Sequence, residues 1–314
     1  MAEQRIDLLT KGCLGTCWYG KYHYLEPWVG CEHDCDYCYA RFRKAVSDSI
    51  QVRGSVFARP VLQMPLPELK TRLAEDLVKE HVQILKISRF TDFFCSTTMQ
   101  NGWTREVLEV ILAAPVKRVI ITTKGAPDED SLKLMEQHPE RFSFNVVAKP
   151  ESELGFESRV PPLEARLSAA ERLNQAGVLT TIHMDPLVPG IEDQSPGLEE
   201  FADLLARRGL KRVMLSLLLL NDPMISLIRS RLGPAGTEKL VASYDLNVDR
   251  QFLPGQEETF YYQPRPEVRR ECLRHMNAVL RERGFSFVLC SLKSGAGGES
   301  GSEGCPRCDG KFYA

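Results

Sequence analysis

Between residues 82 and 219, short apolar runs alternate with longer amphipathic segments, and this alternation constrains the fold of the 314-residue chain most strongly. The runs expected to be strands are 82–87, 118–122, 142–147, 178–184 and 212–219. A segment between two of them places leucines at helical spacing over 163–173, before a helix-ending Gly177. Such alternation predicts a parallel sheet with helical crossovers. With a first strand ending at 28–30, it predicts an α/β fold, an open, partial (β/α)6 barrel.

A short loop with three cysteines follows this first strand. Cys31, Cys35 and Cys38 have C-x3-C-x2-C spacing, and the aromatic Tyr37 precedes the last cysteine. Cysteine thiolates are the ligands of iron–sulfur clusters, and so short a loop can supply three of them to one [4Fe–4S] cubane. The fourth iron then stays open for a small molecule. Zinc sites more often use C-x2-C pairs with four ligands, and disulfides are not expected without a secretory signal.

The run from Trp28 to Arg41 resembles the spore photoproduct lyase-like branch of the radical S-adenosylmethionine (SAM) superfamily. Further similar points are 91–92, 122–125, 161–167 with 176–177, and 185–190, so the resemblance covers roughly residues 25–220. It implies that SAM chelates the open iron and is cleaved reductively to a 5′-deoxyadenosyl radical, which abstracts hydrogen from a substrate. It also implies an electron donor such as flavodoxin or ferredoxin.

The same resemblance implies roles for residues at the strand ends. Tyr37 would lie beside the adenine, and Lys124 would pair with the SAM carboxylate as a point charge. Asn145 would reach the ribose or carboxylate, and the turn at Pro189 and Gly190 would let backbone approach the adenosine. The alternatives are that Lys124 is an exposed turn lysine and that Pro-Gly is an ordinary turn signal.

Cys95 has two interpretations. Spore photoproduct lyase uses a cysteine near the end of the second strand as hydrogen-atom donor, and Cys95 lies near this point. Its spacing from Thr91 and Asp92 does not match that pattern cleanly. Cys95 is therefore either a catalytic thiol that quenches a substrate radical or a buried, inert side chain.

A second set of cysteines indicates an auxiliary metal centre. A Gly/Ser-rich linker at 294–304 precedes a C-P-x-C knuckle, a shape that recurs among metal ligands. The candidate ligands are Cys290, Cys305 and Cys308, with Cys13 or Cys17 as a fourth. An auxiliary [4Fe–4S] cluster is favoured over zinc because the chain already requires cluster assembly. This set is absent from the lyase pattern and makes DNA lesion repair less expected.

Charge and composition narrow the partners. The formal net charge is −2, so no global positive field favours nucleic acid. The N-terminus lacks an apolar signal core, and no apolar run is long enough to span a membrane, so we expect a cytoplasmic protein without membrane association. Ten cysteines in such a chain indicate metal or redox chemistry.

The expected organisation is an N-terminal cysteine-containing segment at 1–24, the barrel at 25–220 and a C-terminal extension at 221–314. Within this extension the strand–helix pattern breaks over 221–266. A radical SAM enzyme acting on a small molecule or peptide is the favoured function. The alternatives are repair of a nucleic-acid lesion and a non-catalytic iron–sulfur or zinc protein. The motifs at successive strand ends favour the enzyme, because a carrier needs no SAM pocket.

Overall fold

The computed structural model describes residues 6–12, 22–152, 154–247, 251–252 and 260–289. Its backbone forms two compact units. Of the described residues, 6–12, 22–146 and 157–180 belong to the first unit, and 147–152, 154–156, 181–247, 251–252 and 260–289 belong to the second. The sequence-based division at residues 24 and 220 stays a prediction.

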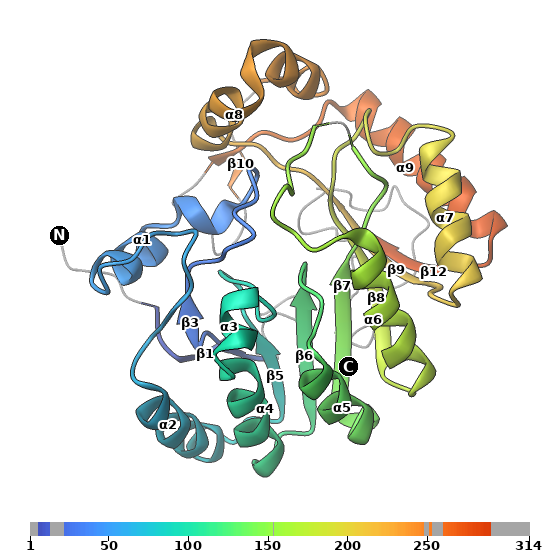
Figure 1. Ribbon diagram of the computed structural model, residues 1–314. Helices are drawn as coiled ribbons and strands as arrows, with labels where there is room; N and C mark the ends of the chain where they lie inside the picture. Colours follow the sequence, from blue (N-terminus) through green and yellow to red (C-terminus); the bar gives the residue numbers. More distant parts are fainter. Residues whose placement is uncertain (1–5, 13–21, 153, 248–250, 253–259, 290–314) are drawn as a thin grey trace. The chain divides into compact units, whose positions relative to one another are not determined.

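A mostly parallel sheet forms the centre of the first unit, in the order β1-β2-β5-β6-β7. Its strands are β1 (Leu9–Lys11), β2 (His23–Leu25), β5 (Ile84–Ile87), β6 (Arg118–Thr123) and β7 (Phe142–Val147). β1 pairs antiparallel with β2, and the other neighbours pair in parallel. Figure 1 shows β5, β6 and β7 side by side. Leu85, Ile87, Val119 and Ile121 are fully buried, as strands of a covered parallel sheet require.

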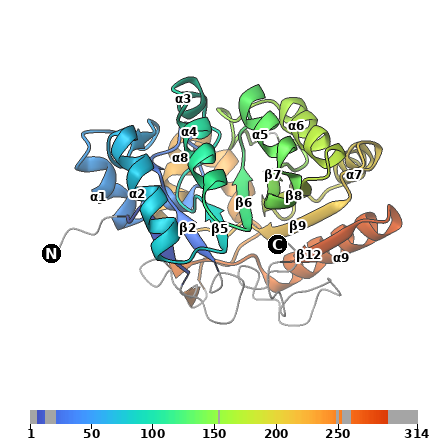
Figure 2. The ribbon, with the colours of Figure 1, turned by 90° about the horizontal axis from the view of Figure 1, so that it is seen from below.

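Amphipathic helices cover this sheet. They are α2 (Leu66–Lys79), α4 (Trp103–Ala113), α5 (Glu129–Gln137) and α6 (Leu163–Gln175). Figure 2 shows α2, α4 and α5 along the same side of β2, β5 and β6. In α2, Leu69, Leu73 and Leu77 form one fully buried stripe, as an amphipathic helix on a sheet requires. Shorter elements are η2 (Tyr39–Phe42), α1 (Lys44–Gln51), α3 (Ser96–Gln100) and η3 (Pro139–Arg141).

The first parallel strand lies earlier in the chain than the sequence predicted. Residues 28–30 were expected to end it, but β2 takes this place, and β3 (Trp28–Val29) instead pairs antiparallel with β4 (Val61–Leu62) in a separate small sheet. Pro27 lies between β2 and β3 and has no N–H to donate to a ladder. The chain therefore leaves the main sheet before it reaches the cysteines.

The second unit contains most of β8 (Leu179–Leu187), with β9 (Arg212–Leu217) and β12 (Ser286–Leu289) parallel beside it. Its helices are α7 (Gly197–Arg207), α8 (Asp222–Val241) and α9 (Pro266–Glu282), and β10 (Gln251–Phe252) pairs with β11 (Phe260–Tyr261). Figure 1 shows α7 and α9 next to each other. The sequence pattern predicted no helix where α8 lies. Among the described residues, no helix has both the length and the apolar character needed to cross a membrane.

Candidate functional site

The three-cysteine loop begins at a tight backbone contact. The Cys31 N–H donates to the Phe57 carbonyl at 2.7 Å, which fixes the first cysteine against the segment after α1. Gly30 has φ +86°, and a Cβ there would lie 2.8 Å from the carbonyl oxygens of Phe57 and Arg59. Only glycine fits both the conformation and the space. The loop therefore leaves β3 along a path that tolerates no side chain at position 30.

The segment after β5 holds the loop from the other side. The Thr91 hydroxyl donates to the Gly30 carbonyl, and the Trp28 indole N–H donates to the Asp92 carbonyl at 3.0 Å. The Glu32 carboxylate accepts hydrogen bonds from the backbone N–H groups of Ser96 and Thr97, the first residues of α3. A carboxylate at a helix N-terminus is favourable because it satisfies otherwise unpaired N–H groups. The cysteine loop, which follows β3, is thus held in place by the segment that follows β5.

Asp92 connects this loop to the end of β6. Its buried carboxylate accepts hydrogen bonds from the Thr123 hydroxyl and the Lys124 N–H, both at 2.6 Å, and from the Phe94 N–H at 2.9 Å. It also lies 3.5 Å from Nε2 of His33. Burial disfavours the Asp92 carboxylate, but His33 and these donors outweigh burial and lower its pKa to about 2. Burial likewise disfavours the His33 imidazolium, but Asp92 outweighs it and raises the pKa of His33 to about 9.

The three loop cysteines are held as protonated thiols when no metal is bound. The Cys95 thiol, and then burial, raise the pKa of Cys31 well above its usual value. Burial raises the pKa of Cys35 well above its usual value and that of Cys38 to about 11, although Lys124 opposes both shifts. Thiolates are the metal-binding form, so metal binding at this loop must release protons.

Lys124 and Tyr37, which the resemblance assigned to SAM, lie together next to these cysteines. The Lys124 ammonium is 5.5 Å from the centroid of the Tyr37 ring, within cation–π range. The buried Tyr37 donates its hydroxyl hydrogen bond to Glu157, and Nη1 of Arg166 lies 4.0 Å from the same carboxylate. The Tyr37 ring is therefore fixed at both its face and its hydroxyl.

A row of polar groups crosses one face of the sheet near Lys124. Thr122 on β6 is paired with Asn145 on β7, and Ser88 directly follows Ile87, the partner of Ile121. Paired residues of parallel strands point to the same face. Among the described residues, the buried side-chain oxygens of Ser88 and Thr122 and both amide atoms of Asn145 have no hydrogen-bond partner. Unsatisfied buried polar groups are costly, so this row fits a polar ligand such as SAM.

Comparison with known proteins identifies the family. A family model described as the radical SAM superfamily matches residues 25–197, more than half of the chain. The chain belongs to the radical SAM superfamily. Membership makes it an enzyme and implies a [4Fe–4S] cluster and SAM. A search among curated proteins finds no match.

Solved structures of spore photoproduct lyase share the fold. The lyase complexed with dinucleoside spore photoproduct aligns with a TM-score of 0.60 and 17% identity, covering 85% of this chain and 75% of that chain. A variant with bound AdoMet and dinucleoside spore photoproduct aligns with a TM-score of 0.60 and 16% identity, with the same coverage. At this identity the likeness shows the fold alone. It confirms the predicted partial radical SAM barrel.

The remaining predicted residues of this radical SAM chain are placed as follows. Cys95 is fully buried at the start of α3, beside Cys31. In the second unit, Gly190 has φ +81°, its N–H donates to Asp193 at 2.6 Å, and a Cβ there would lie 2.9 Å from the Ser243 hydroxyl. Contacts within the chain therefore explain why residue 190 is a glycine. A role for Pro189–Gly190 at the adenosine stays a prediction. The candidates Cys13, Cys17, Cys290, Cys305 and Cys308 lie outside the described residues.

Sequence reasoning did not predict several residues that shape the radical SAM site. His33 was uninformative by position, yet the structure pairs it with Asp92. Glu157 and Arg166, which orient Tyr37, lie more than a hundred positions later in the chain. The only available signal was Asp92 itself, a carboxylate five residues after the predicted strand at 82–87. Carboxyl ends of parallel strands meet at one edge, so a polar residue there is a candidate partner for the loop.

Proposed function

We propose that this radical SAM enzyme binds a [4Fe–4S] cluster through Cys31, Cys35 and Cys38 and cleaves SAM reductively. The observation that carries this proposal is the convergence of Lys124 and the fixed Tyr37 ring on a loop of three free cysteines. When bound, the cluster and SAM supply the 5′-deoxyadenosyl radical that abstracts hydrogen from an organic substrate. A carrier protein would have no need of a lysine and an aromatic ring positioned beside its cysteines.

In this proposal the residues of the chain bind and orient SAM. The Lys124 ammonium attracts the methionyl carboxylate, because three rotatable N–H donors on a flexible stem suit a single carboxylate. Tyr37 presents its ring to the adenine while Glu157 fixes its hydroxyl. Asn145 satisfies its buried amide by hydrogen bonds to the ribose or carboxylate. Pro189 and Gly190 supply backbone to the adenosine.

The cluster loop is pre-organised for this role by its neighbours. The Asp92 carboxylate accepts a hydrogen bond from the Lys124 N–H and attracts His33. This one carboxylate therefore holds the cysteine loop close to the end of β6, where Lys124 is proposed to bind SAM. Such second-layer contacts fix the orientation of metal ligands and tune their basicity. Cys95, buried next to Cys31, is retained as the candidate hydrogen-atom donor, and a flavodoxin or ferredoxin as the electron donor.

A small molecule or peptide is the proposed substrate. The net charge of −2 supplies no global attraction for a polyanion. The alternative is a nucleic-acid lesion, since the structural neighbours include spore photoproduct lyase with dinucleoside spore photoproduct. The second, auxiliary cluster proposed from the terminal cysteines favours the first class.

Electron paramagnetic resonance on anaerobic, reconstituted protein tests the cluster and SAM site. The reduced wild type is expected to show a [4Fe–4S]⁺ signal that changes shape when SAM is added. A signal that SAM leaves unchanged would contradict binding at an open iron. Incubation with deuterated candidate substrates then tests the substrate class, because abstraction transfers deuterium into 5′-deoxyadenosine. Deuterium transfer from a damaged dinucleotide, and none from small molecules or peptides, would instead indicate that the substrate is a nucleic-acid lesion.

A further inference from the structure

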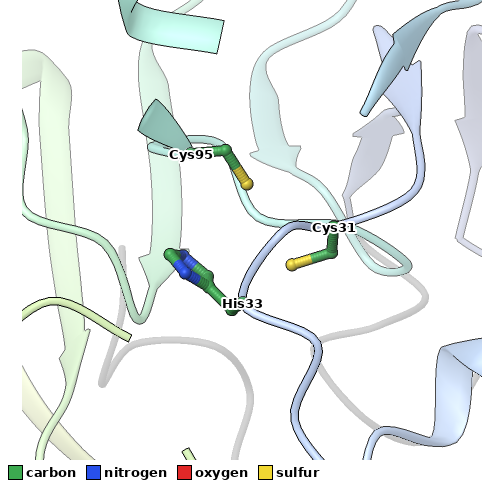
Figure 3. Close-up of side chains that lie close together, drawn as sticks. All are labelled: Cys31, His33 and Cys95. Carbon is green, nitrogen blue, oxygen red and sulfur yellow. The ribbon is translucent and has the colours of Figure 1, made fainter. Parts of the chain in front are cut away.

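Three potential metal ligands from two separate segments meet beside the cysteine loop. Figure 3 shows the side chains of Cys31, His33 and Cys95 lying close together. One ligand atom from each, the two sulfurs and an imidazole nitrogen, all lie within 4.8 Å of one another. Cys31 and His33 belong to the cysteine loop, whereas Cys95 directly precedes α3, after β5. Cys35 and Cys38 are not members of this group.

The separation of these atoms suits one metal ion. Zinc bonds of about 2.3 Å to sulfur in a tetrahedral site place two thiolates about 3.8 Å apart. The observed limit of 4.8 Å therefore leaves roughly 1 Å to be closed, which small side-chain rotations supply. Hydrogen bonds already hold the backbone of the two segments in place. The Cys31 N–H donates to Phe57, and the Glu32 carboxylate accepts from the first turn of α3. Side-chain rotation alone can therefore bring the ligand atoms together.

His33 supplies a second, independent sign of a ligand. The residue is only 3% exposed, its Nε2 faces the Asp92 carboxylate at 3.5 Å, and its Nδ1 has no hydrogen-bond partner among the described residues. A buried ring nitrogen without a partner is costly, and a metal ion at the nitrogen that does not face Asp92 would remove this cost. Metal-binding histidines commonly donate their other ring N–H to a carboxylate, which orients the ring. The Asp92 carboxylate, 3.5 Å from Nε2, is positioned to do this for His33.

We propose that Cys31, His33 and Cys95 form a mononuclear site for a zinc-class divalent cation in the cluster-free protein. Two thiolates and an imidazole match the donor preference of zinc, and a fourth position stays open for water. On binding, each of the two thiols and the imidazolium ring of His33 loses one proton to solvent, and two metal–sulfur bonds and one metal–nitrogen bond replace bonds from the ion to water. No electron is transferred.

This site shares Cys31 with the cluster of the proposed function, and this consequence alone rests on that proposal. Cys31 cannot bond to the mononuclear ion and to a cluster iron at once. Zinc and the cluster therefore exclude each other, and bound zinc keeps the chain in a form without SAM cleavage. Cys95 is a ligand of the mononuclear ion but not of the cluster. Removing Cys95 should therefore abolish binding of the ion and leave the cluster ligands intact.

Anaerobic titration with Co²⁺ tests the site, because cobalt replaces zinc and its thiolate bonds give a near-ultraviolet charge-transfer band. The test uses full-length, metal-free wild type, Cys95→Ser, and the double variant Cys35→Ala/Cys38→Ala. The terminal cysteines are present in all three proteins, so their contribution cancels in the comparison. We expect Cys95→Ser to lose about one equivalent of bound Co²⁺ and its band. The double variant should bind as the wild type does.

The opposite pattern, loss in the double variant and retention in Cys95→Ser, would overturn the proposal, because the ion would then use the cluster cysteines. Equal binding by all three proteins would overturn it as well. His33→Gln gives an independent reading, with at least a tenfold weaker affinity expected. Circular dichroism of the metal-free variants checks folding. Cluster reconstitution of Cys95→Ser separates this inference from the proposed function: a cluster that forms while the Co²⁺ result fails would overturn only the zinc site.

Discussion

At the scale of single residues, buried charges hold the strand ends that form the site. Glu26, directly after β2, is fully buried and accepts a hydrogen bond from the Arg89 N–H at 2.5 Å. The Arg89 guanidinium lies 4.7 Å from the centroid of the Tyr24 ring and 4.9 Å from that of Phe90. Burial dominates over the attraction of Arg89 and raises the pKa of Glu26 to about 7. This carboxyl group is therefore half protonated near neutral pH.

The raised pKa of Glu26 predicts a pH-dependent stability. The folded chain holds this proton up to about pH 7, whereas the unfolded chain releases it near 4.5, so the free energy of unfolding falls as pH rises between these values. From pH 5 to pH 8 the loss from this group is roughly 2–3 kcal/mol. Glu26→Gln keeps the acceptor for Arg89 but cannot ionise. Urea unfolding of both metal-free proteins at the two pH values checks this: equal pH dependence in wild type and variant would show that Glu26 is already ionised.

Lys124 allows a second test at the same scale. If its ammonium pairs with the methionyl carboxylate, Lys124→Ala weakens SAM binding by about 1–3 kcal/mol, the range for losing a hydrogen bond to a charged group. Equilibrium binding of SAM to the reconstituted protein measures this. Lys133→Ala is the matched control, because Lys133 is an exposed residue on α5 with its ammonium 3.5 Å from Glu129. Iron content should stay constant in both variants, and an unchanged SAM affinity in Lys124→Ala would remove Lys124 from the site.

At the scale of elements, the site depends on two loops that follow neighbouring strands. The segment after β5 and the turn after β6 approach each other so closely that a Cβ on Gly125 would lie 2.1 Å from the Phe94 carbonyl oxygen. The same two loops supply Asp92 and Lys124. The glycine therefore sets the distance between the loop that holds the cysteines and the lysine assigned to SAM.

Gly125→Ala is expected to destabilise the chain by about 1–3 kcal/mol, because the added methyl group meets rigid backbone. Gly197→Ala is the control, since its added Cβ has nothing within 4 Å and the residue begins α7. That variant should change stability by less than about 0.5 kcal/mol. Thermal unfolding of both variants measures the difference. Equal melting temperatures for the two would show that the loops can separate without cost.

Elements with regular periodicity could be predicted from sequence, and interrupted ones could not. The helical spacing over 163–173, which forms α6, and the apolar runs of β5 to β9 indicated helix and strand directly. In α8, Gly233 takes a non-helical conformation and Pro234 follows, so the helix is kinked and its apolar pattern does not continue through. The three cysteines were evident because they are close in sequence. The Tyr37–Glu157 contact was not, because only the tertiary fold brings these residues together.

At the scale of the whole molecule, the ten cysteines are enough for more than one metal centre. We predict an auxiliary [4Fe–4S] cluster at Cys290, Cys305 and Cys308, with Cys13 or Cys17. The variant Cys305→Ala/Cys308→Ala should then lose about four irons per chain. Iron and zinc analysis of wild type and variant measures this. Loss of one zinc instead would indicate a structural zinc site, and no change in either metal would remove the auxiliary centre.

Reductive cleavage of SAM tests the central claim most directly. Reconstituted, anaerobically reduced wild type is incubated with SAM, and 5′-deoxyadenosine is quantified by chromatography and mass spectrometry. We predict that the wild type forms 5′-deoxyadenosine and that a variant with Cys31, Cys35 and Cys38 all changed to alanine forms none. Product from the triple variant at the wild-type rate, or none from wild type with a full cluster, would contradict the proposed function.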